Sequence, residues 1–193
     1  LPEGSLQVHA TTAYHTKSPH ASYSNLIRGA IEGLAGILGG ADSVHTLRHD
    51  VLTEEPTAFS RGLARNAQLL ARHESFLSAV ADPLAGAYAI EQLTHDLTEA
   101  AWGRYQETMK DGGLPALLQS GSLQTTLKEN LARRKAALQS GEQVFLGENK
   151  HPDPDAPKEI TLHPNFHFQP GQGGDFASLS PVLDFQLLQD NPT

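Results

Sequence analysis

The chain has 193 residues, 38% of them hydrophobic and 19% charged, which fits one globular domain with a sizeable core. Its net charge of −8 argues against nucleic acid as a partner, and no apolar run approaches the ~20 residues of a membrane span. The absence of cysteine excludes disulfides and thiolate metal sites and is compatible with a reducing cytoplasm, where we expect the protein.

The first third of the chain predicts a strand, a loop and a helix. Leu6–Thr12 is a short apolar-leaning run and is predicted as a strand, followed by a polar loop over Ala13–Ser24. Asn25–Leu38 is predicted as a buried helix that ends at Gly39-Gly40, because glycine readily adopts the left-handed conformation of a helix stop. Its wide apolar face comprises Leu26, Ile27, Ala30, Ile31, Leu34, Ile37 and Leu38.

Two more strand–helix pairs follow. Ser43–Leu47 is predicted as a strand, and Thr57 can cap a helix that runs to about His73. Phe76–Ala81 is a third apolar run, predicted as a strand, and Asp82-Pro83 then starts a turn. A long amphipathic helix comes next, with apolar residues at helical spacing: Ile90, Leu93, Leu97 and Ala101.

The last part of the chain is predicted to be helical and then extended. Leu114–Gln119 predicts a short helix, and Ser122 is expected to cap a further helix that Gly141 stops. Gln143–Leu146 resembles a brief strand. From His151 onward the chain holds seven of its twelve prolines, so we divide it into residues 1–150 and an extended tail or linker, 151–193.

The stretch Ala81–Trp102, ADPLAGAYAIEQLTHDLTEAAW, resembles the end of the substrate-binding barrel of the methylmalonyl-CoA mutase family. That family combines an Asp-Pro pair, a Gly-bearing turn and an "E-x-LT-x-x-L…AW" helix. The resemblance runs in unbroken order from Val8 to Lys150. Its other segments are VHATT, YSNLIRGAIEGLAGILGG (the family's "Y-x-N-x-x-R" helix), SVHTL, PTAFSRGLARNAQLL and FLGENK (its "G-V-N" strand).

The resemblance implies an α/β fold, the C-terminal part of a (β/α)8 TIM barrel with about three βα units. Alternating strands and helices agree with parallel strands, but three strands cannot close a barrel that needs eight. The chain also begins at Leu1 without an initiator Met, so we expect it to be part of something longer, with the earlier strands elsewhere.

The family's activity is the adenosylcobalamin-dependent isomerisation of methylmalonyl-CoA and succinyl-CoA, by a radical held in a dry barrel. The family's cobalamin-binding motif, Asp-x-His-x-x-Gly, does not occur in this sequence. We therefore expect the cofactor on a partner chain or another domain, and we assign no cofactor-binding residue here.

The sequence departs from the catalytic chains of the family and is more similar to its small, inactive subunit. In the catalytic chains, the histidine at the position of His9 is followed by one residue and then by Gln-Thr, whereas here it is followed by Ala10-Thr11-Thr12. Leu47 stands where the catalytic chains have Asn. The loop with Lys17-Ser18 replaces their Ser-Gly-Trp. These departures remove polar groups from strand ends, where a barrel binds its ligand.

Three residues are candidate site residues by this resemblance. His9 is the candidate catalytic group, where an imidazole could donate to a thioester carbonyl, and its alternative is a packed or relict histidine. His45 and Gln68 are candidate substrate-binding groups, with a buried structural histidine and a helix-surface amide as their alternatives. A basic cluster, Arg133-Arg134-Lys135, either contacts coenzyme A phosphate or forms a solvated helix face.

We expect no metal site, because the sequence contains no His-Glu-x-x-His motif. The favoured function is that of a small subunit which pairs with and stabilises a catalytic large chain in a heterodimer. The alternatives are a catalytic mutase chain for this or a related acyl-CoA, which could form a homodimer, and a truncated interaction module. The acyl group itself is not indicated, because the residues expected to recognise it precede Leu1.

Overall fold

A computed structural model describes residues 6–156 and 160–161 of the chain. The described residues form two compact units, one built from those up to residue 81 together with those from 135 onward, and the other from residues 82–134. The predicted tail from His151 lies mostly outside the described residues, and the division at residue 150 stays a prediction.

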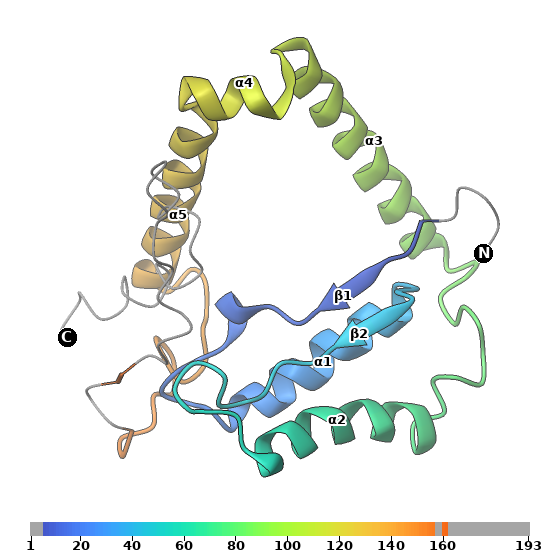
Figure 1. Ribbon diagram of the computed structural model, residues 1–193, viewed down its shortest axis with the longest axis vertical. Helices are drawn as coiled ribbons and strands as arrows, with labels where there is room; N and C mark the ends of the chain where they lie inside the picture. Colours follow the sequence, from blue (N-terminus) through green and yellow to red (C-terminus); the bar gives the residue numbers. More distant parts are fainter. Residues whose placement is uncertain (1–5, 157–159, 162–193) are drawn as a thin grey trace. The chain divides into compact units, whose positions relative to one another are not determined.

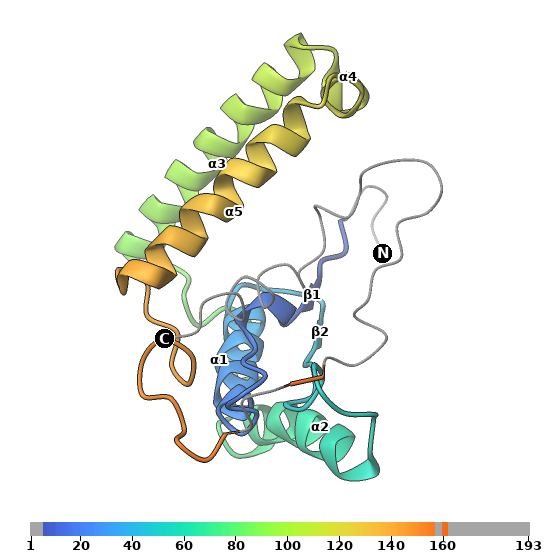
Figure 2. The ribbon, with the colours of Figure 1, turned by 90° about the vertical axis from the view of Figure 1, so that its left-hand side faces the viewer.

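The first unit begins with two strands, two α-helices and a short 3₁₀ helix, which can be followed by colour in Figure 1. In chain order they are β1 (His9–Thr11), the 3₁₀ helix η1 (Tyr14–Thr16), α1 (Ser24–Leu38), β2 (Ser43–His45) and α2 (Ala58–His73). Figures 1 and 2 show α1 running alongside both strands, with α2 next to it. The end of α5 and the residues after it also belong to this unit.

The two strands form a parallel sheet, as the strand–helix order predicted. His9 pairs with Ser43, Ala10 with Val44, and Thr11 with His45. Because side chains alternate along a strand, each register pair shares one face of the sheet. The middle pair, Ala10 and Val44, lies against α1, so the outer two pairs lie on the opposite, exposed face.

The helix predicted over Asn25–Leu38 is confirmed as α1, but the expected burial of its apolar face is wrong. Gly29 and Gly33 are buried, while Ile27 and Ile31 remain 66% and 62% exposed. The glycine side faces the sheet because only glycine allows so close an approach. A Cβ added to Gly36 would lie 3.3 Å from both Ala10 Cβ and Val44 Cγ2.

The predicted start of α2 is confirmed in detail. Thr57 is the N-cap: its hydroxyl accepts a hydrogen bond from the Ser60 N–H at 3.0 Å, and its own N–H donates to Ser60 Oγ at 3.2 Å. This reciprocal capping box satisfies two N–H groups that a helix start leaves without partners. The helix ends at His73, as expected.

The third strand, predicted at Phe76–Ala81, is wrong, since the described structure has turns and bends there. Phe76 has a φ of +52° and is 71% exposed. The Leu77 N–H donates back to Ala71 O at 3.2 Å, and the Ala79 N–H donates to Phe76 O at 2.9 Å. These local bonds replace a strand ladder, so the described chain contains two βα units and not three.

The brief strand predicted at Gln143–Leu146 is also wrong. The described residues show only a single isolated bridge there, between Leu146 and Lys150. The observed fold is therefore mixed α/β and mostly helical, with a small parallel sheet, which is consistent with a fragment of the predicted architecture.

The second unit contains α3 (Tyr88–Lys110), α4 (Gly113–Ser120) and most of α5 (Ser122–Ser140). The helix α5 starts at Ser122 itself, so Ser122 is its first residue and not the expected cap. No residue of α3 is buried, and its predicted apolar positions Ile90, Leu93 and Leu97 are 40%, 55% and 62% exposed. None of the described helices is long and apolar enough to cross a membrane.

Candidate functional site

The exposed face of the sheet carries the two histidines that the sequence singled out. His9 and His45 both lie on it, on neighbouring strands. The His9 ring nitrogen Nδ1 lies 2.6 Å from Ser43 Oγ on the paired strand, so a hydrogen bond orients the imidazole. The face thus presents imidazole and hydroxyl groups that could bind a polar ligand.

The loops that follow the two strands are joined at the carboxyl edge of the sheet. The Thr12 N–H donates to His45 O at 3.0 Å, and Thr12 Oγ1 accepts from the Leu47 N–H at 2.9 Å. Thr12 is buried and Leu47 belongs to the small apolar core. Parallel α/β folds bind ligands at this edge. The conformation of these loops therefore determines which polar groups a ligand could reach.

Asn25, in the first turn of α1, connects the two loops. It is 1% exposed. Its amide nitrogen donates to Ser18 O at 2.8 Å in the first loop and to His49 O at 2.9 Å in the second. Its amide oxygen accepts from the Ser18 N–H and from Arg28 Nη1, both at 2.9 Å. One buried side chain therefore fixes both loops to the same helix.

An ion pair between a buried lysine and a partly buried glutamate fixes the loop after β1 a second time. Lys17 is 0% exposed, and its ammonium lies 2.9 Å from both carboxylate oxygens of Glu32 on α1. Glu32 also accepts from the Ala13 N–H at 2.8 Å and from Thr16 Oγ1 at 2.6 Å. Three donor groups thus make four hydrogen bonds to one carboxylate, which locks residues 13–17 onto the helix.

These contacts shift the pKa of both charged groups. Burial raises the pKa of the Glu32 carboxyl, but the hydrogen bonds from Thr16, Lys17 and the Ala13 N–H outweigh burial, so this pKa lies below its ordinary value. Burial lowers the pKa of the Lys17 ammonium, and the bonds to Glu32 offset that effect only in part. The pair is a structural lock, since a fully buried ammonium cannot reach a ligand.

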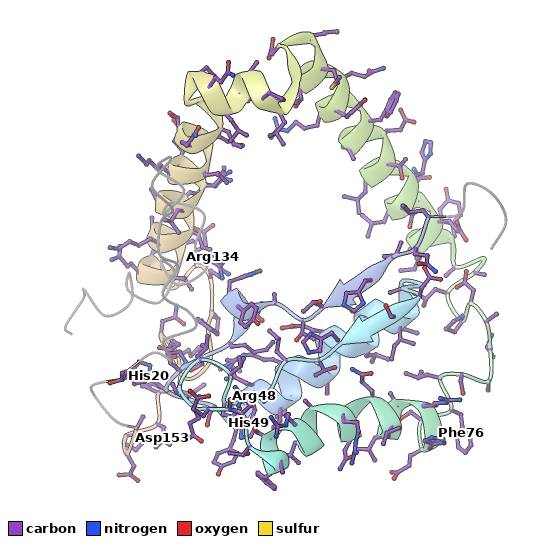
Figure 3. The ribbon with its side chains drawn as sticks, viewed as in Figure 1. His20, Arg48, His49, Phe76, Arg134 and Asp153 are labelled. Atoms are coloured by element: carbon purple, nitrogen blue, oxygen red, sulfur yellow. The ribbon has the colours of Figure 1, made fainter. Side chains whose placement is uncertain are left out.

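The second loop has its own charged contact. Arg48 Nη1 lies 2.5 Å from Asp50 Oδ1, and Arg48 Nη2 donates to Glu54 O at 3.0 Å. His49 is stacked on Tyr23 at a ring-centroid distance of 5.7 Å. Figure 3 labels Arg48, His49 and His20 in this region. Both loops therefore have defined conformations held by side chains.

Gln68, the third predicted site residue, is bonded to the sheet. Its amide nitrogen donates to Val44 O and to Thr46 Oγ1, each at 3.0 Å. The side chain is partly buried and ties α2 to β2. The structure thus places His9 and His45 on one face of the sheet, while the Gln68 amide is already hydrogen-bonded to a backbone carbonyl.

Sequence reasoning missed the residues that hold the loops, chiefly Asn25, Lys17 and Glu32. The signal was present, because Asn25, Arg28 and Glu32 are polar positions within the quoted segment YSNLIRGAIEGLAGILGG. They recur at helical spacing of three and four residues and therefore share one side of α1. No role was assigned to that side from the sequence, although it faces the loops.

The described residues contain no group of three or more His, Cys, Asp or Glu that could hold a metal ion. Of the basic cluster on α5, Arg133 donates to Asn130 Oδ1 at 2.8 Å along the helix surface. Neither observation identifies a cofactor site in this part of the chain.

Comparison with known proteins gives a consistent set of relatives. A family model described as methylmalonyl-CoA mutase matches residues 3–173. The methylmalonyl-CoA mutase of Rhizobium meliloti is 38% identical over 146 residues, and the mitochondrial one of Mus musculus is 36% identical over 146 residues. The methylmalonyl-CoA mutase large subunit of Propionibacterium freudenreichii is 37% identical over 147 residues. Each alignment covers 76% of this chain but only 20% of the relative, so the chain spans about a fifth of their length.

Proposed function

The chain belongs to the methylmalonyl-CoA mutase family, and we propose that it is part of the acyl-CoA-binding barrel of a small, non-catalytic mutase subunit. Its role would be to pair with and stabilise a catalytic large chain that isomerises methylmalonyl-CoA and succinyl-CoA. The same barrel could still bind an acyl-CoA. We place this assembly in the cytoplasm.

The observation that supports this proposal most is the locked loop after β1. A loop that contacts a large thioester should present its polar groups to the ligand. Here its lysine, Lys17, is fully buried against Glu32, and its Ser18 is fully buried against Asn25. These polar groups of the loop are hydrogen-bonded within the protein and do not face a ligand, as expected of a subunit with a structural role.

The residues present give no positive indication of an adenosylcobalamin site. The family's Asp-x-His-x-x-Gly motif does not occur in the sequence, and the histidine on β1, His9, is hydrogen-bonded to Ser43. When bound to a mutase, this cofactor supplies radical chemistry. We therefore propose that the cofactor is held by the partner chain or by another domain.

A catalytic role is the second candidate, and two observations favour it. One relative that the chain matches is named a large subunit. His9 and His45 also remain on the exposed sheet face, where they could donate to a thioester carbonyl. In that case the chain would be the substrate-binding part of a mutase that carries its own cofactor domain.

The experiment that separates the two candidates uses the full-length protein, alone and with a co-purified large chain. Methylmalonyl-CoA turnover is measured with and without adenosylcobalamin. For a small subunit, the protein alone is inactive, the complex is active, and His9→Ala in this chain leaves the activity of the complex unchanged. Turnover by the protein alone that His9→Ala abolishes would instead establish the catalytic role. His73→Ala, at an exposed position at the end of α2, is the matched control.

A further inference from the structure

The segment that follows α5 lies against the loop after β1. We call residues 145–150 the strap and residues 13–21 the first loop. Leu146 O in the strap accepts from Arg28 Nη2 on α1 at 2.6 Å. The Arg28 guanidinium also lies 4.9 Å from the centre of the Phe145 ring, and Phe145 packs against the apolar core that includes Leu47.

Glu148 is the centre of this contact. Its side chain is 5% exposed. It accepts a hydrogen bond from Ser18 Oγ, and its carboxylate oxygens lie 2.9 and 3.1 Å from Nδ1 of His20. Since a carboxylate can only accept, both first-loop groups act as donors. A buried carboxylate is costly unless it is paired in this way, so Glu148 holds the strap to the first loop.

Gly147 allows the strap to come so close. Its φ is +85°, and a Cβ there would lie 2.5 Å from Ala21 Cβ. Asn149 braces the strap from behind: its amide nitrogen donates to Leu138 O at 2.8 Å, and its amide oxygen accepts from the Phe145 N–H at 2.7 Å. The strap therefore has a fixed shape and is anchored to the end of α5.

We propose that the strap is a conformational lock on the first loop, so that the two segments open and close as one unit. Ser18 joins two sets of bonds, because its hydroxyl donates to Glu148 and its N–H donates to Asn25. Lifting the strap removes the partner of the Ser18 hydroxyl and of His20. The first loop then loses its outer support, and access to the carboxyl edge of the sheet increases. This coupling does not depend on whether the chain is catalytic.

The test is amide hydrogen exchange, read by mass spectrometry, on the full chain and two variants. Glu148→Gln removes the charge that holds the strap. Gly147→Ala leaves the charge and instead inserts a methyl group at the contact with Ala21, at a φ that alanine rarely adopts. The control is Glu142→Gln, which makes the same chemical change at an exposed position just before the strap.

Both strap variants should speed exchange about tenfold or more in residues 143–150 and also in residues 13–21. Exchange in α2, residues 58–73, should be unchanged, and the control should match the wild type. Faster exchange in 143–150 alone would overturn the proposal, because the strap would then move independently. An equal increase in α2 would overturn it as well, since that result means general loss of stability.

Discussion

Replacing Asn25 tests whether one buried amide organises the carboxyl edge of the sheet. In Asn25→Ala, the Ser18 N–H, Ser18 O and His49 O all lose their partner inside the protein. Arg28 loses a contact too, but it keeps Leu146 O. The change therefore leaves three backbone groups in a buried region without a hydrogen bond.

The expected cost follows from these contacts. A neutral hydrogen bond contributes about 1 kcal/mol net, and leaving a buried group unsatisfied costs about 1–3 kcal/mol. Three such groups at a side chain that is 1% exposed predict a loss of about 3–4 kcal/mol in the free energy of unfolding, after partial relaxation. Asn25→Asp should cost at least as much, because it keeps the shape but sets carboxylate oxygens against two carbonyl oxygens.

The assay is urea unfolding of the full chain, followed by circular dichroism. Asn66→Ala on α2 is the matched control, since Asn66 is exposed and its Oδ1 accepts a long, 3.4 Å bond from the neighbouring Arg65. The control should change the free energy of unfolding by less than about 0.5 kcal/mol. If Asn25→Ala also lies within about 1 kcal/mol of the wild type, Asn25 does not organise the loops and the reasoning is refuted.

Three further predictions follow from other contacts. The folded-state pKa of Glu32 lies below its ordinary value, so the stability that its carboxylate contributes is present above the unfolded-state pKa and is lost as pH falls through the folded-state pKa. In Glu32→Gln, the free energy of unfolding should therefore fall less steeply with decreasing pH. An unchanged slope would contradict this. Gly36→Val should lower the free energy of unfolding by about 2 kcal/mol, because a Cβ at this position would already lie 3.3 Å from Val44. Gly62→Val should be nearly neutral, because a Cβ there has no neighbouring atom within 4 Å. Equal effects of the two changes on thermal unfolding would refute the close-approach argument. Gln68→Ala should cost about 1–2 kcal/mol in urea unfolding, through the loss of its bonds to Val44 O on β2 and to Thr46 Oγ1 just after it. A stable variant with weaker acyl-CoA binding would instead indicate a ligand contact.

The sequence predicted helices better than strands, for a physical reason. Helix α2 was correct from its Thr57 cap to His73, because caps and periodicity are local signals. Strand pairing depends on a neighbour that local sequence does not contain. The apolar run at Phe76–Ala81 has the composition of a strand, yet its N–H groups bond within a turn. No local rule could have shown that a pairing partner is missing.

The candidate site was predicted only in part. The faces of His9 and His45 follow from strand alternation once the parallel register is known. The orientation of α1 did not follow, because hydrophobic periodicity favours burying Ile27 and Ile31. Instead, α1 buries the side that carries Gly29 and Gly33, where the helix lies close to Thr46. Sequence patterns count apolar residues as candidates for burial and give no weight to glycine as a contact surface.

The hydrogen bonds of two polar residues from the segments that resemble the family bear on how that resemblance is interpreted. Asn25 and Gln68 each bond to backbone groups of the loops or of β2. A chain that had lost catalysis would still need both to keep its fold, so their presence is not evidence of activity. His9 is different, because its ring is exposed and its hydrogen bond reaches only the neighbouring Ser43 side chain. The distinction between catalytic chain and small subunit therefore depends on His9 and its surroundings on the exposed sheet face.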